Sequence, residues 1–347
     1  MPEPTVAILI VTYDSAGDLP GCLEAVAAQE HRPLELVIVD CNSQDESVEV
    51  ARSEAARLAS EQSRVAVTVE PLGKNLGFSG GMNAALRLCE APYVLALNAD
   101  ARPEPSFIGC LLERLEADER AAAATGRLVR MPDAEGHRRL DACGMYLSRA
   151  WRHFDRGSGE VDHGQLMTSE LVFGATGAAT LYRRRALEDV AFDGAEVFDE
   201  CFHSYREDAE LCFRFQERGW RVVYEPAARA EHRRRVVPQN RRSLPAAINY
   251  HSLKNRYLLR AYHQTADNLL RTLVPTLVRD LAALAYVLLF ERSSFSAYAW
   301  LWRHRRAIAL RRRFIQARRT EPTTTVDQWF WQSSKPLDSE RSPVDER

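Results

Sequence analysis

The chain has 347 residues, 46% of them hydrophobic, and its formal net charge is -2, which is typical of an ordinary globular protein with one large or two smaller domains. Its seven cysteines are scattered without C-x-x-C spacing, which argues against a zinc knuckle or a disulfide framework and favours a reducing compartment. The first residues lead straight into an apolar run without a basic region, so we expect no secretory signal.

Four short apolar runs in the first hundred residues predict β-strands, at 6–11, 34–39, 65–69 and 93–97. Helical patterns lie between them, the first over residues 19–29 and the last over residues 82–89. Because strands and helices alternate with connections of this length, we predict right-handed crossovers and a parallel sheet.

Three of these strands end in or next to an aspartate, namely Asp14, Asp40 and Asp100. The carboxyl edge of an open parallel sheet is where ligands bind, and a carboxylate there can hold a divalent cation that in turn holds phosphate oxygens. Asp100 follows Asn98 and Ala99, and taken alone it can equally start a turn or cap the next helix. The recurrence after three strands favours a shared site at one edge of the sheet.

The positions of the glycines argue against two other classes of α/β enzyme. A dinucleotide-binding domain needs G-x-G-x-x-G after the first strand, but residues 12–21 hold two glycines at the wrong spacing. Residues 77–81 match the G-x-S-x-G pattern of a serine hydrolase around Ser79, yet residues 70–76 separate this motif from its strand. We instead expect these glycines to let the backbone approach a ligand, with Lys74 and Asn75 beside it.

The middle of the chain predicts a helix over residues 107–117 and a strand over 121–129, followed by a polar stretch to about residue 164 that no pattern assigns. Residues 171–182 alternate small and apolar side chains and predict one further strand, whose glycines leave room for something to lie against it.

A second informative stretch, residues 205–220, predicts a helix that Gly219 ends. Glu207 and Asp208 fall on its first turn, where the helix dipole stabilises negative charge. They can serve only that purpose, or one of them can act as a general base at the same cleft. A short strand at 221–224 follows, and His232 beyond it is either structural or within reach of a metal held by Asp100.

Together these pieces resemble the inverting glycosyltransferases of family 2, and most of all the bacterial rhamnosyltransferase-like enzymes within it. The resemblance covers about residues 6–319. It implies an α/β GT-A fold over residues 1–240, with a mostly parallel, Rossmann-like sheet flanked by helices and a C-terminal helical, membrane-associating extension. The motifs that carry it are residues 11–13, 40–45, 75–83, 97–100 and 207–211, the last with Arg214 and residues 219–220.

The resemblance also implies roles for individual residues. Asp100, with His232 as a second ligand, would hold Mg²⁺ or Mn²⁺, and Asp208 would be the base, with Glu207 beside it. Gly177, Arg214 and Trp220 would contact the acceptor. The sequence departs from the family at Cys41, where asparagine is usual, and at residues 98–100, which keep only the last acid of Asp-x-Asp. The donor site would comprise Thr12, Tyr13, Asp14, Asp40, Asn42, Ser43, Lys74, Asn75, Gly77, Phe78, Asn83, Asn98 and Ala99.

The partners implied are a dTDP- or UDP-linked sugar donor and a lipid-linked or polysaccharide acceptor. The alternative from another class is a scaffold that binds nucleotide-sugar or glycan without catalysis; the retained Asp100 and Asp208 speak against it.

The C-terminal region, residues 241–320, is predicted to be helical. Residues 269–290 are apolar but contain Arg271, Pro275, Arg279 and Asp280, which argues against a transmembrane span. With the arginine-rich run at 300–319, they predict amphipathic helices on an anionic membrane surface, which the resemblance would place at the cytoplasmic face of a bacterial plasma membrane. The alternative is a packed subdomain with a solvated basic face. No nucleic-acid-binding motif accompanies the run, so we expect no nucleic acid. Residues 321–347 are expected to be largely disordered apart from 329–331.

Overall fold

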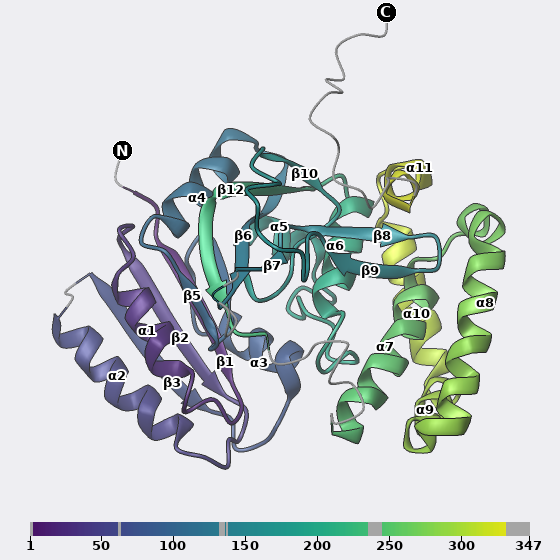
Figure 1. Ribbon diagram of the computed structural model, residues 1–347, viewed down its shortest axis with the longest axis horizontal. Coiled ribbons are helices and arrows are strands. Elements are labelled where there is room, and N and C mark those ends of the chain that lie inside the picture. The colour runs from purple at the N-terminus through teal and green to yellow at the C-terminus, as the bar shows by residue number, and fades with distance from the viewer. Residues whose placement is uncertain (1–2, 62–63, 132–135, 137, 235–244, 331–347) are drawn as a thin grey trace, which may run out of the picture.

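The structure is a computed structural model that describes residues 3–61, 64–131, 136, 138–234 and 245–330. A central sheet is flanked by helices, and the helices of the C-terminal third gather beside it (Figure 1). The strands are β1 (Val6–Thr12), β2 (Leu34–Asp40), β3 (Val65–Pro71), β4 (Tyr93–Leu97), β5 (Ala101–Pro103), β6 (Ala121–Arg130), β7 (Leu140–Ala142), β8 (Met145–Ser148), β9 (Arg152–Asp155), β10 (Glu170–Val172), β11 (Ala179–Arg183) and β12 (Arg221–His232).

The helices form two groups, one around the sheet and one at the C-terminal end. The longer helices are α1 (Leu19–Ala27), α2 (Ser47–Glu61), α3 (Gly77–Leu86), α4 (Phe107–Ala117), α6 (Glu207–Glu217), α7 (Ala246–His263), α8 (Ala266–Phe290), α9 (Ser296–Arg303) and α10 (Arg305–Arg318). The short ones are α5 (Arg184–Val190), α11 (Thr323–Asp327), η2 (Arg292–Phe295) and η3 (Gln328–Phe330).

The sheet has ten strands, with the order β10-β12-β6-β11-β4-β1-β2-β3, and β5 and β7 pair with β12 and β6. Strands β3, β2, β1 and β4 run parallel, which confirms the prediction for the first half of the chain. Strand β11 runs antiparallel to both β4 and β6, so the sheet becomes mixed beyond β4. The carboxyl ends of β1, β2 and β4 therefore meet at one edge, as predicted.

The helix predicted over residues 107–117 is confirmed as α4, with the same bounds. The prediction of a single strand over residues 171–182 is wrong. Two strands occupy that stretch: β10 pairs with β12 at one edge of the sheet, and β11 lies between β4 and β6. Most of the connection between them is buried, including Phe173 and Ala175, which are 0% exposed. A buried loop is as apolar as a buried strand, so the hydrophobic pattern does not separate the two.

Ser79 lies inside α3 and is fully buried, which rules out the exposed nucleophile that a serine hydrolase needs. The glycines around it serve the packing of the chain against itself. At Gly77, whose φ is +67°, a Cβ atom would come within 2.3 Å of the carbonyl oxygen of His203. The backbone that approaches closely here is therefore the protein's own.

The end of the chain packs back onto the sheet domain. Trp329 and Phe330 are buried, and the Trp329 indole N–H donates to the Gln216 side chain at 3.2 Å. The order of these two residues agrees with the exception made for residues 329–331, whereas α11 (Thr323–Asp327) lies where disorder was predicted. Residue 331 and those after it, like the domain boundary predicted near residue 240, lie outside the described residues.

The predicted amphipathic segment is one continuous helix, α8, with Pro275 inside it. Among the described helices it is the one whose length and composition would allow a membrane crossing, and 11% of its most apolar window is buried. Its inner side bonds to the sheet domain: the Arg279 guanidinium donates to the Ala150 carbonyl at 3.0 Å, and Asn268 accepts from the Trp151 indole at 2.8 Å. Its other side is an exposed apolar stripe.

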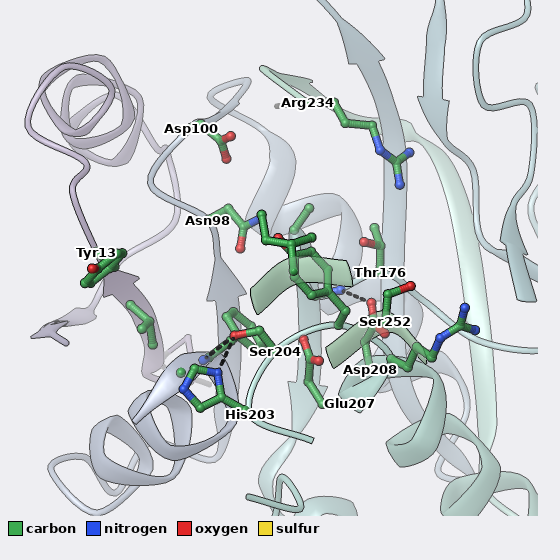
Figure 2. Close-up of a pocket in the computed structure, with 18 of the residues that line it drawn as sticks. Tyr13, Asn98, Asp100, Thr176, His203, Ser204, Glu207, Asp208, Arg234 and Ser252 are labelled. Atoms are coloured by element: carbon green, nitrogen blue, oxygen red, sulfur yellow. Dashed lines mark hydrogen bonds between the residues drawn. The ribbon is translucent and has the colours of Figure 1, made fainter. Parts of the chain in front are cut away.

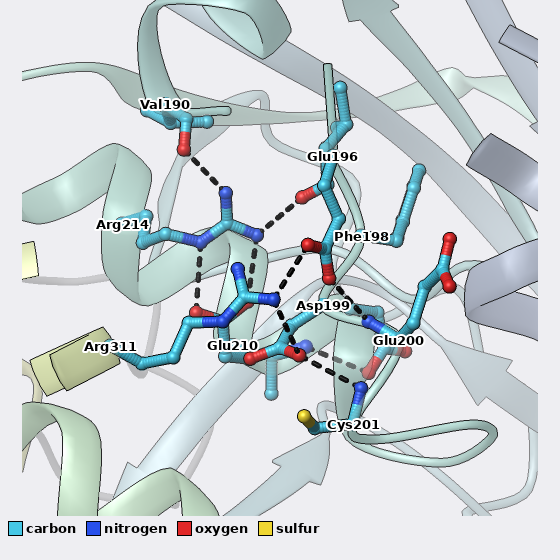
Figure 3. Close-up of polar contacts among 12 residues, drawn as sticks. Val190, Glu196, Phe198, Asp199, Glu200, Cys201, Glu210, Arg214 and Arg311 are labelled. Carbon is cyan, nitrogen blue, oxygen red and sulfur yellow. Dashed lines mark hydrogen bonds and ion pairs between the residues drawn. The ribbon is translucent and has the colours of Figure 1, made fainter. Parts of the chain in front are cut away.

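A buried network of charges joins α6 to the loop before it and to α10 (Figure 3). The Arg214 guanidinium donates to both oxygens of Glu210, at 2.8 and 2.7 Å, and both side chains are at most 3% exposed. Arg311 of α10 pairs with Glu196 at 2.6 Å and lies 4.0 Å from Asp199. Because charges removed from water must be paired, this network fixes where α6 and α10 each sit against the loop before α6.

Replacing Arg214 by alanine is expected to lower the free energy of unfolding by about 3–5 kcal/mol, because the Glu210 carboxylate would stay buried without its partner. The matched control is Arg57→Ala, which removes a pair with Glu54 whose side chains are 42% and 25% exposed. Such a surface pair contributes less than about 1 kcal/mol. Urea unfolding measures both losses, and equal losses would contradict the role assigned to the network.

Candidate active site

A cavity of about 700 Å³ opens at the carboxyl edge of β1 and β4 and at the N-termini of α3 and α6. Tyr13, Asn98 and Asp100 lie on one side of it, and Asp208 and Arg234 lie on the other (Figure 2). The predicted site residues that line it are Tyr13, Asn75, Gly77, Phe78, Asn98, Ala99, Asp100, Gly177, Glu207, Asp208 and His232.

The loops after β1 and β2 are held together by several residues predicted to contact the donor. Asp40 is 1% exposed and accepts hydrogen bonds from the Thr12 hydroxyl at 2.9 Å and from the Ser43 hydroxyl at 2.5 Å. The Asp14 carboxylate accepts the Gln44 backbone N–H at 2.7 Å. These side chains shape the edge of the site without lining the cavity.

Three more predicted donor residues also lie outside the cavity lining. Asn42 and Lys74 are exposed. Asn83 is 1% exposed; its amide donates to the Phe198 carbonyl at 2.8 Å and accepts from the Phe198 N–H at 2.9 Å. Asn83 therefore holds the loop before α6 in place, because both ends of its amide are bonded inside the protein.

Asp100 and His232 come together although 131 residues separate them. The antiparallel pairing of β12 with β5 sets His232 opposite Ala101, and its Nε2 lies 3.2 Å from the Asp100 carboxylate. The Nδ1 of His232 bonds to Asp141 at 2.7 Å. Burial opposes charge on the imidazole, but the hydrogen bonds to Asp100 and Asp141 prevail and raise the pKa of His232 to about 9.

This arrangement fits a divalent cation. A metal-binding histidine commonly gives its second ring nitrogen to a carboxylate, as His232 does to Asp141, and so turns the other nitrogen toward the ion. The described residues form no group of three or more side chains able to hold a metal. Asp100 and His232 would thus be two protein ligands, and the remaining ligands would be phosphate oxygens and water, which is the usual situation for Mg²⁺.

Glu207 and Asp208 begin α6 at the opposite wall. Asp208 accepts the backbone N–H of Gly177 at 3.1 Å and that of Ala209 at 2.7 Å. Burial nevertheless raises the pKa of Asp208 to about 6. Burial, and then the charge of Asp208, raise the pKa of Glu207 well above its ordinary value, and its Oε2 has no hydrogen-bond partner. Of the two acids, burial therefore favours the neutral form of Glu207, and the backbone N–H groups that face Asp208 favour its carboxylate.

A strained turn presents these two acids to the cavity. His203, Tyr205 and Arg206 have φ values of 65°, 70° and 74°, in the left-handed region that non-glycine residues rarely adopt. The side-chain amide of Asn255 on α7 donates to the carbonyls of Phe202, Ser204 and Tyr205 at 2.9, 2.8 and 2.7 Å. The C-terminal region is thus part of the site, because α7 holds the turn that starts α6.

Arg214 and Trp220 are not at the cavity, which corrects their predicted contact with the acceptor. Arg214 is 3% exposed and bonded to Glu210 (Figure 3), and the Trp220 indole donates to Asp189 at 2.8 Å. Both keep α6 packed. Gly177 does line the cavity, at the N–H that bonds Asp208.

The sequence-based reasoning missed a whole wall of the cavity. This wall comes from the β8–β9 hairpin, which lies in the stretch left unassigned, from the turn before α6, and from the start of α7. A recognisable signal existed only for Arg206, which precedes Glu207 directly. The missed lining residues include Arg152, His153, Asp155, His203, Arg206, Arg234, Asn249 and Ser252.

Among solved structures, the fold is similar to that of a mannosyltransferase from Pyrobaculum calidifontis in complex with GDP-Man and Mn²⁺, with a TM-score of 0.52 and 18% identity over 95% of this chain and 85% of that one. It is also similar to GalNAc-T7 with UDP, GalNAc and Mn²⁺, with a TM-score of 0.57 and 12% identity over 75% and 49% of the two chains. At these identities the likeness bears on the fold alone, and it confirms the GT-A fold predicted from the sequence.

A curated relative is the undecaprenyl-phosphate 4-deoxy-4-formamido-L-arabinose transferase of Pseudomonas fluorescens, 31% identical over 118 residues. The alignment covers 33% of this chain and 33% of the relative, so this chain spans about a third of the relative's length. The model of the family described as "Glycosyl transferase family 2" matches residues 7–191, just over half of the sequence. The chain therefore belongs to glycosyl transferase family 2.

Proposed function

We propose that this chain is a metal-dependent, inverting glycosyltransferase that moves a sugar from a nucleoside-diphosphate donor to a hydroxyl group of an acceptor. The observation that carries the proposal is the pair of opposed walls in one cavity: Asp100 and His232 on one, and the buried carboxylate of Asp208 on the other. A cation-binding edge facing a base is what single-displacement sugar transfer requires.

In the proposed mechanism the donor lies along Tyr13, Asn75, Phe78 and Asn98, with its diphosphate toward Asp100 and His232. A divalent cation bound there would neutralise the charge that develops on the leaving diphosphate. Asp208 takes the proton from the acceptor hydroxyl as the new oxygen–carbon bond forms and the carbon–diphosphate bond breaks. The sugar carbon is inverted in one step, so no covalent intermediate and no nucleophilic serine are needed.

The donor is proposed to carry dTDP or UDP, with a deoxysugar such as rhamnose as in the branch that the sequence resembles. The acceptor is proposed to be lipid-linked or a growing cell-surface polysaccharide. Two of the similar proteins support these classes: GalNAc-T7 in complex with UDP, and a transferase named for undecaprenyl phosphate. A non-catalytic scaffold is disfavoured because it would have no use for an ionised, buried Asp208.

We further propose peripheral contact with the anionic, cytoplasmic face of a membrane through α8 and α10. The outer side of α8 exposes a stripe of large apolar side chains, among them Leu270 (75%), Val274 (71%) and Val278 (63%). Trp302 beside α10 is 70% exposed. Exposed arginines on the same part of the chain complement anionic lipids, and they are Arg303, Arg305, Arg306 and Arg313.

The other arginines of the basic run are structural. Arg311 pairs with Glu196, Arg312 donates to backbone carbonyls of α7 and the turn after it, and Arg319 pairs with Glu217. Arg318 donates to the Asp189 carbonyl at 2.6 Å. The membrane contact therefore relies on about half of the charge that the sequence offers, together with the apolar stripe.

Donor binding is expected to depend on metal and on Asp100. Calorimetric titration with dTDP and UDP, with and without Mn²⁺, should give Mn²⁺-dependent binding to at least one of them. Asp100→Asn should weaken it at least about tenfold, because a charged ligand of the ion is lost. Asp193→Asn, a change of the same kind at an exposed position outside the cavity, should not. A folded protein that binds neither nucleotide, nor any other nucleoside diphosphate, would overturn the proposal.

Turnover is expected to follow the ionisation of Asp208. The deprotonated form is the active one, so kcat/KM should be constant above the pKa of Asp208, about 6, and fall tenfold per pH unit below it. Asp208→Asn should lower kcat about 10²–10⁴-fold with donor binding intact. Glu207→Gln is the comparison: burial raises the pKa of Glu207 and so favours its uncharged form, which glutamine imitates, and this variant should keep most of the activity. Full activity of Asp208→Asn would refute the assignment.

Membrane contact is expected to need the apolar stripe of α8. In co-sedimentation with phosphatidylglycerol vesicles, Val274→Glu should lose most of the bound fraction, and Leu88→Glu, at a 43% exposed position of the sheet domain, should retain it. Neutral phosphatidylcholine vesicles should bind the wild type less, because the arginines then lack a counter-charge. If Val274→Glu binds the vesicles as the wild type does, the stripe does not contact the membrane. The same conclusion follows if the wild type proves to be a dimer in solution and Val274→Glu dissociates it.

A further inference from the structure

The side of the cavity that holds Asp208 also carries four uncharged polar side chains. Tyr205 comes from the turn before α6, Asn249 and Ser252 come from the first two turns of α7, and Thr176 comes from the loop after β10. Figure 2 shows Thr176 and Ser252 together with Asp208, away from the proposed cation site. The proposed mechanism gives these four residues no task, although they lie in the same cavity as the base.

The amide of Asn249 is buried and yet has no partner. The residue is 7% exposed, and its side chain forms no hydrogen bond with any other residue that the structure describes. Burying an amide without a partner costs free energy, so an amide kept in this state at a cavity wall indicates a ligand. The Ser252 hydroxyl is likewise unbonded among the described residues. Residues three apart on a helix are neighbours on one face, so one ligand can contact both side chains.

Tyr205 presents an aromatic ring to the same cavity on a strained backbone. Its φ is 70°, in the left-handed region that bulky residues rarely adopt, and it is 37% exposed. The side chain of Asn255 on α7 holds this conformation by donating to the Tyr205 carbonyl at 2.7 Å. Strain of this kind collects at ligand-binding sites. Helix α7 therefore fixes the ring with one side chain and offers an amide and a hydroxyl to the same cavity.

Charge on this side of the cavity does not select an anionic ligand. Arginines line it together with the carboxylates of Asp155 and Asp208, and Arg234 pairs with Asp155. An anionic acceptor would approach the carboxylate of the base against electrostatic repulsion, whereas a neutral acceptor would not. The ligand that suits this side is therefore uncharged, and it can bond to an amide and to hydroxyl groups.

A sugar ring has this complementary chemistry. The C–H groups of the ring form an apolar face that an aromatic side chain can cover, and the hydroxyls around its rim both donate and accept. An asparagine amide offers a donor and an acceptor on one planar group, and a serine hydroxyl also does both. Tyrosine adds an apolar body with a polar tip. A phosphate has no apolar face and an alkyl chain has no polar rim, so neither would use all of these groups.

We propose that Tyr205, Asn249 and Ser252 form a saccharide subsite that holds the acceptor. A sugar ring lies against the Tyr205 side chain, and its hydroxyls bond to the amide and the hydroxyl that α7 presents. One further hydroxyl of the sugar then faces Asp208. This rests on the proposed function, and it narrows the acceptor to a molecule whose reacting residue is a neutral sugar rather than the phosphate of a lipid.

The test measures the binding of small glycosides to the full chain by ligand-observed NMR. The nucleoside diphosphate found to bind is kept at saturation with Mg²⁺, and its Kd is measured first for every variant. The probes are the methyl glycosides of glucose, galactose, mannose, rhamnose and N-acetylglucosamine. Decyl phosphate, below its micellar concentration, is the probe for a lipid-borne phosphate.

The variants remove the ring and the polar groups separately. They are Tyr205→Ala, Tyr205→Phe, and the double variant Asn249→Ala with Ser252→Ala. The matched control is Ser53→Ala, which removes an exposed helical hydroxyl from α2, outside the cavity. Tyr205→Phe keeps the ring, so it separates the loss of the stacking surface from any change in the turn.

We expect at least one methyl glycoside to bind the nucleotide-saturated protein more tightly than decyl phosphate does. Tyr205→Ala and the double variant should each raise its Kd at least about fivefold, because a stacking surface or two hydrogen bonds are lost. Tyr205→Phe should keep the Kd within about twofold of the wild type, because the ring is retained. Ser53→Ala should leave it unchanged, and all variants should keep the nucleotide Kd.

Four results would overturn the subsite while leaving the proposed function intact, because nucleotide binding is measured first. One is that no methyl glycoside binds at any concentration up to its solubility. Another is a glycoside that the wild type and the variants bind alike, since it would then occupy the place of the donor's sugar. The third is tighter binding of decyl phosphate than of every glycoside. The fourth is loss of nucleotide binding in both Tyr205→Ala and the double variant, which would assign these side chains to the donor. A wild type that binds no nucleoside diphosphate would instead contradict the proposed function.

Discussion

The site depends on one hydrogen bond, from the backbone N–H of Gly177 to the Asp208 carboxylate at 3.1 Å. A carboxylate at the start of a buried helix is stable as an anion only if backbone N–H groups face it. Gly177 supplies one such N–H. Glycine suits this position because a Cβ atom would lie 3.2 Å from the Phe78 ring, and a larger side chain would press on Phe78 at the donor side of the cavity. The bond therefore ties the base, the loop after β10 and the N-terminus of α3 to a single geometry.

The same bond explains why the C-terminal helices belong to the catalytic unit. Asp208 reaches Gly177 only if α6 starts where it does, and α6 starts after a turn with three left-handed residues. Such a turn costs of the order of 1–3 kcal/mol per residue and persists only where its surroundings fix it. Asn255 of α7, fully buried, fixes it through three carbonyls. The charges of Figure 3 hold α10 against the loop that leads into the same helix α6.

The features that the sequence predicted well depend on local residue patterns and on the direction in which the strands run. The parallel strands, the aspartates at their ends and the first turn of α6 follow from periodicity and capping, which act over a few residues. The meeting of Asp100 with His232 was left open beside a purely structural role for the histidine, because it depends on the pairing of β12 with β5 across the sheet. The β8–β9 hairpin escaped prediction because its short strands alternate weakly and lie within a polar stretch.

Residue type was the least informative guide to role. Arg214 and Trp220 sit in a motif of the family, yet both act in packing, whereas Arg206, which touches the cavity, was passed over as the residue before the acids. The arginines of α10 divide in the same way between internal pairs and exposed charge. Burial and partner decide these roles, and both arise from contacts between segments that lie far apart in the sequence.

The cavity is ordered by charge along its width. At one end Asp100 and Asp141 surround His232, so that a cation is favoured; at the other lie Glu207 and Asp208, at the start of α6. Asp208 lies across the cavity from Asp100, and burial together with the charge of Asp208 raises the pKa of the neighbouring Glu207 well above its ordinary value. The proposed donor diphosphate with its cation would thus be drawn to the end at Asp100, and the base would face it from the start of α6.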